Sequence, residues 1–279
     1  MATEPGGGLV DTHCHLVLLE DRGLLEEALE AAAAAGVEQI VSIGLDVEDS
    51  DRNRVLAERH PGIFFTVGWH PHQKTAPDPA QMRDLDALLR HPRAVAVGEV
   101  GLDRYWRPGY HEVPLEVQRR SLAALLELAV SHGKPVVIHD REAHDEVLAE
   151  IDVRPGVRGV MHCFSGDAAH ARASVARGFA CSFAGTVTFP RSEAIQAAAR
   201  AVPDDAWVVE TDAPFLAPVP HRGRPNQPAY VAATTAALAR LRQIGVADAA
   251  RQSSANARRW FGLPAPRGGD RLGNGAARR

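Results

Sequence analysis

The stretch Pro135-Val136-Val137-Ile138-His139 decides the fold, because it is a short continuous run of β-branched residues that ends at a histidine. A continuous apolar run, without alternation of polar residues, is typical of a parallel strand that is buried on both faces. Seven further segments of the chain share this pattern. They are residues 8–13, 39–44, 64–68, 94–99, 159–162, 179–183 and 207–211. We therefore expect eight buried parallel strands.

Helical patterns separate these segments, so strands and helices alternate along the chain. The expected helices cover residues 23–35, 114–131, 167–177, 191–201 and 229–242. The first ends at Gly36 and the second at Gly133, while Asp167 caps the start of the third. Eight strand–helix units in roughly 250 residues indicate a single-domain (β/α)8 TIM-type barrel. The alternative is an open doubly wound sheet, although no G-x-G-x-x-G motif follows the first strand.

The composition is that of a globular protein. The chain has 279 residues, with 45% hydrophobic and 24% charged residues, and 35 acidic against 31 basic residues give a net charge of −4. These values exclude a collagen-like, disordered or coiled-coil chain. The acidic balance argues against a strongly basic nucleic-acid coat, but not against an enzyme that handles nucleic acid locally with metal ions. No apolar run approaches the ~18 residues of a membrane span, so we expect no membrane partner.

The expected organisation is one barrel domain over residues 8–263, with a flexible N-terminus at 1–7 and a disordered tail at 264–279. The tail is rich in Gly, Arg and Ala. The first eight residues lack the regions of a signal peptide, and the three cysteines are too few for a disulfide framework. We therefore expect a reducing, cytoplasmic location, and no obligatory protein partner is evident.

The segment His13-Cys14-His15 places two imidazoles two residues apart at the end of the first expected strand. Alternation along a strand directs both side chains to one face, which suits two ligands of one metal ion. The pair alone is a weak signal in a chain with 13 histidines, and His70-Pro71-His72 repeats the spacing. The other strands supply the context.

Further ionisable residues stand at the expected ends of later strands. They are Glu99, His139, His162 and Asp212. The carboxyl ends of barrel strands meet at one face, where barrel enzymes hold their sites. Together with the first two imidazoles, these side chains favour a metal centre, because buried ionisable groups are costly without a partner or a metal.

Six ligands exceed a single tetrahedral site, so we expect two divalent metal ions. Two ions need a bridging anion, and Glu99 is the best candidate because neither Lys74 nor Lys134 ends an expected strand. Imidazoles suit Zn, Ni or Fe, whereas the carboxylates also admit Mg or Mn, so the identity of the metal stays open.

Five segments in order resemble the signatures of the TatD family, which are metal-dependent deoxyribonucleases among the amidohydrolase-like barrels. They are DTHCHL at 11–16, GEVGLD at 98–103, VIHDREAH at 137–144, MHCFSG at 161–166 and ETDAPFL at 210–216. The similarity spans about residues 9–262 and includes segments 68–72, 222–226 and 228–230. It implies a hydrolase of DNA phosphodiesters, often a 3′–5′ exonuclease on single strands or strand ends. It also implies one ion held by His13, His15, Glu99 and Asp212, and a second held by Glu99, His139 and His162.

The resemblance leaves alternatives open. Asp140 stands where the family usually has a small residue, and alternation predicts that its side chain turns away from the metals. Deacylation of D-aminoacyl-tRNA has also been assigned within the family, so hydrolysis of another ester or amide is the second hypothesis. The third is a metal-binding scaffold without turnover, and the complete ligand set counts against it.

Five residues are expected to act on the substrate or the attacking water, one of them a predicted ligand. Asp212 is expected to accept a proton from the attacking water, in addition to its role as a ligand. Arg141 is placed to bind a phosphate oxygen as a planar donor. Arg222 and Arg224 lie in a loop at the same mouth and are expected to contact the nucleic-acid backbone. His70 is expected to contact phosphate or to orient a ligand.

Other reactive residues have simpler interpretations. Cys14 and Cys163 neighbour expected ligands and are expected to face away from them as small buried hydrophobic residues. His111, His132 and His170 have no partner that the sequence makes evident.

Overall fold

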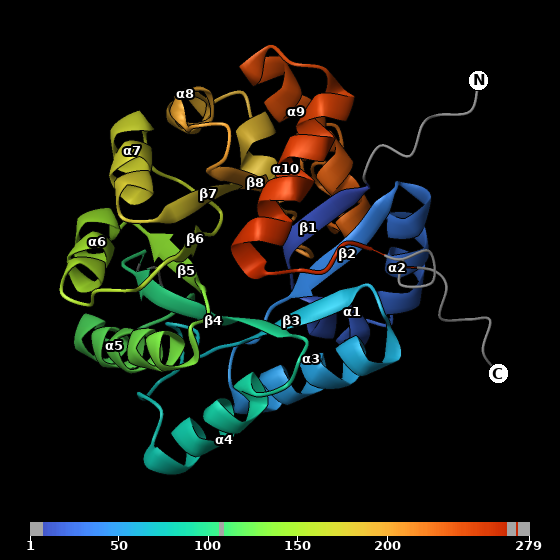
Figure 1. Ribbon diagram of the computed structural model, residues 1–279. Coiled ribbons are helices and arrows are strands. Elements are labelled where there is room, and N and C mark those ends of the chain that lie inside the picture. The colour runs from blue at the N-terminus through green and yellow to red at the C-terminus, as the bar shows by residue number, and fades with distance from the viewer. Residues whose placement is uncertain (1–7, 106–108, 267–271, 273–279) are drawn as a thin grey trace.

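The computed structural model describes residues 8–105, 109–266 and 272. Within them, eight strands form one sheet in sequence order, and all neighbouring strands in that order are parallel. The strands are β1 (Leu9–Cys14), β2 (Val37–Ser42), β3 (Ile63–Val67), β4 (Ala94–Asp103), β5 (Val136–Arg141), β6 (Gly159–Met161), β7 (Phe179–Phe183) and β8 (Trp207–Val209). The sheet curves into a nearly closed barrel with helices around it (Figure 1). This confirms the predicted TIM-type barrel and excludes the open sheet.

Helices connect the strands and cover the outside of the barrel. The α-helices are α1 (Leu16–Asp21), α2 (Leu25–Ala34), α3 (Val47–Arg59), α4 (Pro79–Leu89), α5 (Leu115–His132), α6 (His144–Asp152), α7 (Ala168–Ala176), α8 (Glu193–Ala201), α9 (Val231–Arg242) and α10 (Val246–Phe261), and the 3-10 helices are η1 (Gly185–Thr188) and η2 (Pro228–Tyr230). The five helices predicted from sequence are present within two residues of the expected ends. Gly133 ends α5 with a φ of 62°, and the Asp167 side chain accepts hydrogen bonds at the start of α7.

The barrel closes between its first and last strands at their carboxyl ends. The backbone N–H of His15 donates to the carbonyl of Ala213 at 2.8 Å, and the N–H of Asp212 donates to the carbonyl of His13 at 2.9 Å. Asp11 accepts hydrogen bonds from both the backbone and the hydroxyl of Thr211. This seam brings residues 13–15 directly beside residue 212, although nearly 200 positions separate them in sequence.

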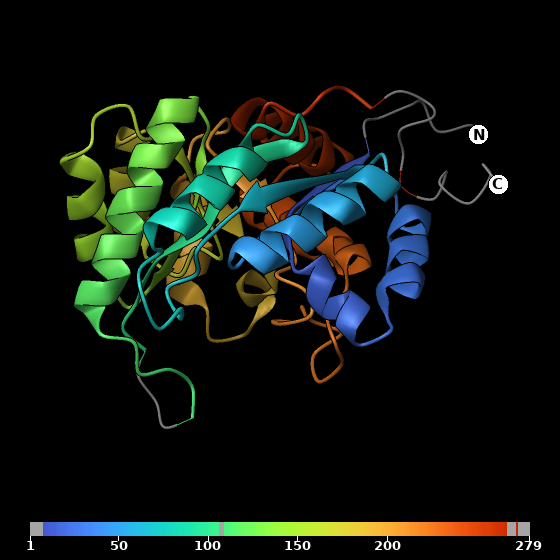
Figure 2. The same ribbon diagram turned by 90° about the horizontal axis from the view of Figure 1, so that it is seen from below.

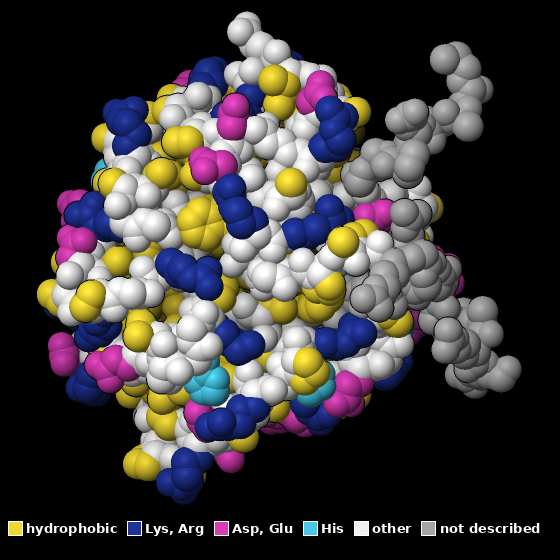
Figure 3. All heavy atoms as spheres, viewed as in Figure 1, with side chains coloured by type: hydrophobic (Ala, Val, Ile, Leu, Met, Phe, Trp, Pro, Cys, Tyr) yellow, Lys and Arg dark blue, Asp and Glu magenta, His cyan; other side chains and the backbone are white. Residues whose placement is uncertain are grey.

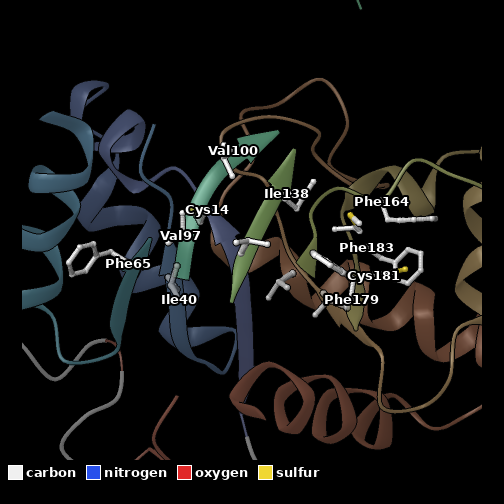
Figure 4. Packing of buried hydrophobic residues seen from close by; sticks show 14 of the residues in the cluster. Cys14, Ile40, Phe65, Val97, Val100, Ile138, Phe164, Phe179, Cys181 and Phe183 are labelled. Carbon is white, nitrogen blue, oxygen red and sulfur yellow. The ribbon is translucent and has the colours of Figure 1, made fainter. Parts of the chain in front are cut away.

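Two apolar layers stabilise the barrel. Alternate strand residues such as Ile138 and Phe183 belong to a large cluster that also takes in the surrounding helices, part of which is drawn in Figure 4. The intervening residues, such as Val137 and Val208, belong to a second cluster with Ala257 and Phe261 of α10. The helix α10 packs against β1, β6 and β8, so it covers one end of the barrel.

The two ends of the barrel are therefore different. Figure 2 shows α10 at one end, whereas the loops after β4 and β8 project from the other. The α10 end, seen in Figure 3, carries intermixed basic, acidic and hydrophobic side chains. No helix among the described residues is long and apolar enough to cross a membrane.

The structure describes only a few residues of the two termini. Residues 1–7 and most of the predicted disordered tail at 264–279 lie outside the described residues. Leu272, within that tail, is buried in the large apolar cluster, and Pro264 accepts a hydrogen bond from Gln39 at 2.9 Å. At these two positions the tail packs against the barrel.

Candidate metal centre

The six predicted ligands lie together, although not all of them end a strand. Strand β4 continues four residues beyond Glu99, and β5 continues two residues beyond His139. Strand β6 ends one residue before His162, and β8 ends at Val209, three residues before Asp212. The prediction that each residue ends its strand is therefore wrong in detail, but the residues converge because the register of the barrel staggers neighbouring strands.

One group of ligand atoms comes from the β1–β8 seam. The Nε2 atoms of His13 and His15 lie 3.3 Å apart, and Nε2 of His15 lies 3.2 Å from Oδ1 of Asp212. Oε2 of Glu99 lies 3.4 Å from Nε2 of His13 and 3.8 Å from Nε2 of His15. These four residues are all buried.

A second group surrounds the other oxygen of the same glutamate. Oε1 of Glu99 lies 2.6 Å from Nδ1 of His139 and 3.2 Å from Nε2 of His162. The two carboxylate oxygens of Glu99 therefore face different sets of imidazoles. This is the geometry that a bridging ligand between two ions requires.

The residues present fit divalent cations. The candidate ligand atoms of His13, His15 and Asp212 all lie within 4.8 Å of one another, as do those of His13, Glu99 and His162. Buried nitrogen and oxygen lone pairs that converge at this range repel one another unless a proton or a cation lies between them. The donor set of imidazole nitrogens and carboxylate oxygens suits Zn and Mn, and the carboxylates also admit Mg.

Two carboxylates that the sequence analysis did not assign lie behind the second group. Oδ2 of Asp103 accepts a hydrogen bond from Nε2 of His139 at 3.0 Å. Oε1 of Glu210 accepts one from Nδ1 of His162 at 3.0 Å. Such partners fix the tautomer of a ligating imidazole and make it more basic. Alternation could have found Asp103, because residues 99, 101 and 103 share a face of β4.

The first group lacks this support. The Nδ1 atoms of His13 and His15 are buried and have no hydrogen-bond partner among the described residues. The imidazoles of His139 and His162 therefore have carboxylate partners on their second nitrogen, whereas within the described part of the chain those of His13 and His15 do not.

The electrostatics of the cluster keep the carboxylates ionised. Burial alone would raise the pKa of Glu99, but the neighbouring imidazoles, His162 foremost, hold it well below its ordinary value. For Asp212, burial is likewise outweighed by the hydrogen bond from His15, which lowers the pKa. Burial would lower the pKa of His139, yet its hydrogen bonds to Asp103 and Glu99 raise it to about 9.

The histidines after β3 act as hydrogen-bonding groups. Nδ1 of His70 accepts a hydrogen bond from the backbone N–H of His72 at 3.2 Å, so its proton is on Nε2. That Nε2 lies 3.5 Å from Oε1 of Glu99, and burial lowers the pKa of His70 to about 4. His70 is therefore a neutral donor aimed at the cluster.

Three histidines for which no partner is evident from sequence each have one in the structure. Nε2 of His111 lies 3.4 Å from Oδ1 of Asp103, whereas His132 pairs with Asp86 at 2.7 Å. His170 hydrogen-bonds with Asp167 at the start of α7. His111 is not favoured as a metal ligand, because its Nδ1 accepts the N–H of residue 113 and the proton is then on Nε2.

Five of the six predicted ligands, all except the fully buried His13, line a cleft of about 640 Å³ at the mouth of the barrel. Arg141 also lines this cleft; its Nη1 lies 2.8 Å from the hydroxyl of Tyr110, and its guanidinium lies 3.8 Å from the ring centre of Tyr105. His70 is part of the lining, whereas Arg222 and Arg224 are not among the described residues that line it. The guanidinium of Arg222 instead lies over the ring of Phe189 at 4.2 Å.

Two expectations about side-chain direction need correction. Cys14 is buried in the apolar cluster as predicted, but Cys163 lines the cleft. Burial raises the pKa of Cys163 well above its ordinary value, so the residue stays a neutral thiol. Asp140 also borders the cleft, although its carboxylate turns to Nδ1 of His144 at 2.6 Å. The backbone of Cys163 leaves the strand conformation, with a φ of 43°, and alternation no longer applies there.

A parallel barrel with a buried cluster of histidines and carboxylates at its mouth defines the chain as a metal-dependent hydrolase with an amidohydrolase-like fold. The family model described as TatD related DNase matches residues 10–262. The chain therefore belongs to the TatD-related DNase family.

Known proteins resemble the chain over nearly its whole length. The uncharacterized metal-dependent hydrolase TatD of Mycobacterium tuberculosis is 38% identical, over 91% of this chain and 98% of that protein. The 3′-5′ ssDNA/RNA exonuclease TatD of Klebsiella pneumoniae is 32% identical, over 85% of this chain and 92% of that protein. The crystal structure of YjjV, a TatD homologue from Escherichia coli, has a TM-score of 0.85 and 30% identity, and the match covers 93% of this chain and 100% of that one.

Proposed function

We propose that the chain is a deoxyribonuclease that cleaves phosphodiester bonds of DNA, acting as a 3′–5′ exonuclease on single strands or strand ends. The observation that carries the proposal is Glu99, whose two oxygens face two separate groups of ligand atoms at the floor of an open cleft. Two divalent ions at such a centre neutralise a phosphodiester and lower the pKa of a water molecule toward neutrality. The name of the Klebsiella pneumoniae relative supports the choice of nucleic acid.

The chain's own residues then have distinct roles. His13, His15, Glu99 and Asp212 hold one ion, and Glu99, His139 and His162 hold the other. The ionised carboxylate of Asp212 accepts a proton from the attacking water.

Donors around the cluster bind the phosphate. Nε2–H of His70 points at the cluster, and Arg141 presents a planar cation that Tyr105 and Tyr110 hold in place. Arg222 and Arg224 are proposed to contact the strand farther from the ions, because their loop follows β8 at the same end of the barrel.

The charge of the chain favours strand ends over long duplexes. A net charge of −4 does not suit tight, salt-sensitive binding to duplex DNA, which depends on many Lys and Arg contacts. Ions that neutralise one phosphate at a time avoid this requirement. We also propose a cytoplasmic location, on the basis of the three free cysteines.

A substrate panel tests the proposal. Single-stranded DNA with either end blocked, RNA, D-aminoacylated tRNA and a chromogenic phosphodiester are each supplied with Mg²⁺, Mn²⁺ or Zn²⁺ after dialysis against a chelator. We expect no hydrolysis without metal, and metal-restored shortening of single-stranded DNA from a free 3′ end. Turnover of the aminoacyl ester alone would replace the nuclease by the alternative hydrolase. Full activity in a preparation verified as metal-free would refute the centre itself.

A further inference from the structure

A strained turn at the mouth of the cleft holds two apolar side chains in solvent. Phe215 is 47% exposed and Leu216 is 37% exposed, and both line the cleft. Leu216 has a φ of 54°, which lies in the left-handed region that non-glycine residues seldom adopt. The backbone is therefore strained at Leu216, although neither its side chain nor that of Phe215 is buried by this conformation.

Buried polar contacts hold this turn from beneath. The side-chain amide of Asn226, which is itself buried, donates to the carbonyls of Phe215 at 2.5 Å and Thr211 at 2.7 Å. Gly185 makes room for the carbonyl of Leu216, because a Cβ at residue 185 would collide with it. Strain that surrounding contacts enforce, together with exposed apolar side chains, is typical of a binding surface rather than of a stabilising one.

Phe215 borders the metal ligands directly. Its ring centre lies 5.9 Å from that of His15, with 74° between the ring planes, and Nε2 of His15 lies 3.2 Å from Asp212. A ligand that contacts both the metal centre and the ring of Phe215 must carry an anionic group, which the ions would bind. It must also carry a flat apolar group, joined to the anion by a short linker. A nucleotide has this chemistry, since one sugar separates its phosphate from its base.

We infer that Phe215 and Leu216 form a base-stacking subsite, where a nucleobase adjacent to the scissile phosphate packs on the ring of Phe215. The inference rests on the proposed nuclease function and adds the residues that hold the base. Stacking on an aromatic ring tolerates every base, because each base has a π face. The presence of a base therefore matters at this subsite, whereas its identity does not.

The test uses the full-length, Mn²⁺-loaded protein and single-stranded DNA whose last or penultimate 3′ residue is either intact or an abasic tetrahydrofuran. We expect the wild type to favour the intact strand by about 5- to 100-fold in kcat/KM at one of these positions. Phe215→Ala brings this ratio close to one, because the rate on the intact strand falls more than the rate on the abasic strand, and Phe215→Trp retains the ratio. Val219→Ala is the matched control, because Val219 is 43% exposed in the same loop but is not among the described residues that line the cleft.

Two outcomes would overturn the subsite. One is equal wild-type rates on intact and abasic strands at both positions, and the other is a Phe215→Ala loss that is the same on both strands. Calorimetric binding of dTMP against deoxyribose 5-phosphate gives a readout without turnover. A preference for dTMP that Phe215→Ala abolishes supports the subsite even where no DNA is hydrolysed, and then only the nuclease proposal has failed. No preference for dTMP contradicts the subsite whatever the nuclease activity.

Discussion

Oδ2 of Asp103 accepts a hydrogen bond from Nε2 of His139 at 3.0 Å, and Nδ1 of the same ring is thereby left to face Glu99 at 2.6 Å. Asp103 is buried, and His72 donates to the same oxygen at 2.9 Å. Burial would raise the pKa of Asp103, but the hydrogen bonds from His139 and His72 outweigh it and hold the pKa well below its ordinary value. We therefore propose that the carboxylate of Asp103 orients His139 as a metal ligand without itself being one.

Replacing this carboxylate should weaken the binding of one metal ion and leave the binding of the other unchanged. Asp103→Asn keeps the size of the side chain but removes the charge, so the affinity for the ion at His139 should fall about 10- to 100-fold. Metal titration of the apoprotein should then show one weakened and one unchanged binding step. His132→Ala is the control, because His132 pairs with Asp86 away from the cluster. Two equally weakened steps would indicate a general structural defect instead.

Metal binding should strengthen with rising pH. In the metal-free protein the pKa of His139 is raised to about 9, so at neutral pH the ring carries a proton that an ion must displace. The apparent affinity should therefore increase between neutral pH and about 9, by up to about tenfold per pH unit for each displaced proton, and then level off. Titrations across this range measure the slope. A flat profile would show that His139 binds the ion without losing a proton.

The bridging role of Glu99 predicts unequal metal losses. Glu99→Ala removes a ligand from both ions, whereas His162→Ala removes a ligand from only one. Elemental analysis of the dialysed variants should find both equivalents reduced in the first variant and one in the second. If both variants lose the same single equivalent, Glu99 does not bridge.

Asp212→Asn separates the role of ligand from that of base. The amide keeps one oxygen donor but cannot take up the proton, so activity should fall by ~10²–10⁴. Metal content should change much less, because His13, His15 and Glu99 still hold that ion. The measurement is a pH–rate profile with metal content determined in parallel. Recovery to the wild-type rate at high pH, with both ions bound, would leave Asp212 as a ligand only.

Arg141 and Arg224 should affect different kinetic constants. Arg141 lines the cleft, so Arg141→Ala should lower kcat/KM about 10- to 100-fold, as expected for a hydrogen bond to a charged group. Arg224 is exposed outside the cleft lining, so Arg224→Ala should mainly raise KM and reduce its salt dependence. Steady-state kinetics at two ionic strengths distinguish them. Unchanged kinetics in Arg141→Ala would remove it from the phosphate site.

The sequence predicts the barrel well because its strands are continuous apolar runs. The segment 179–183 coincides with β7, and the others agree within a few residues. Strand β4 is the exception, since Glu99 and Asp103 interrupt the apolar pattern that marks a strand. The strand continues because residues 100–103 pair with residues 138–141 of β5. The helix α10 was not predicted, because its packing against three strands is a tertiary property.

The sequence also predicts which histidines and carboxylates converge in the buried cluster, because each one is close to the carboxyl end of a strand. The prediction omits Asp103, which alternation along β4 could have found, and Glu210, whose position depends on the imidazole that it faces in space. Tyr110 is in a loop, where no periodicity indicates which way a side chain turns. Arg222 is assigned to the substrate because its loop follows the eighth expected strand at the mouth, whereas its stacking on Phe189 depends on the fold.

The helix α10 closes the end of the barrel opposite the cleft. Its residues Ala257 and Phe261 belong to the apolar cluster inside the barrel. Among the described residues, the candidate metal centre is therefore accessible from the cleft. Under the proposed nuclease function, a DNA strand therefore reaches the cluster from the cleft side of the barrel, and the cleaved piece leaves on that same side.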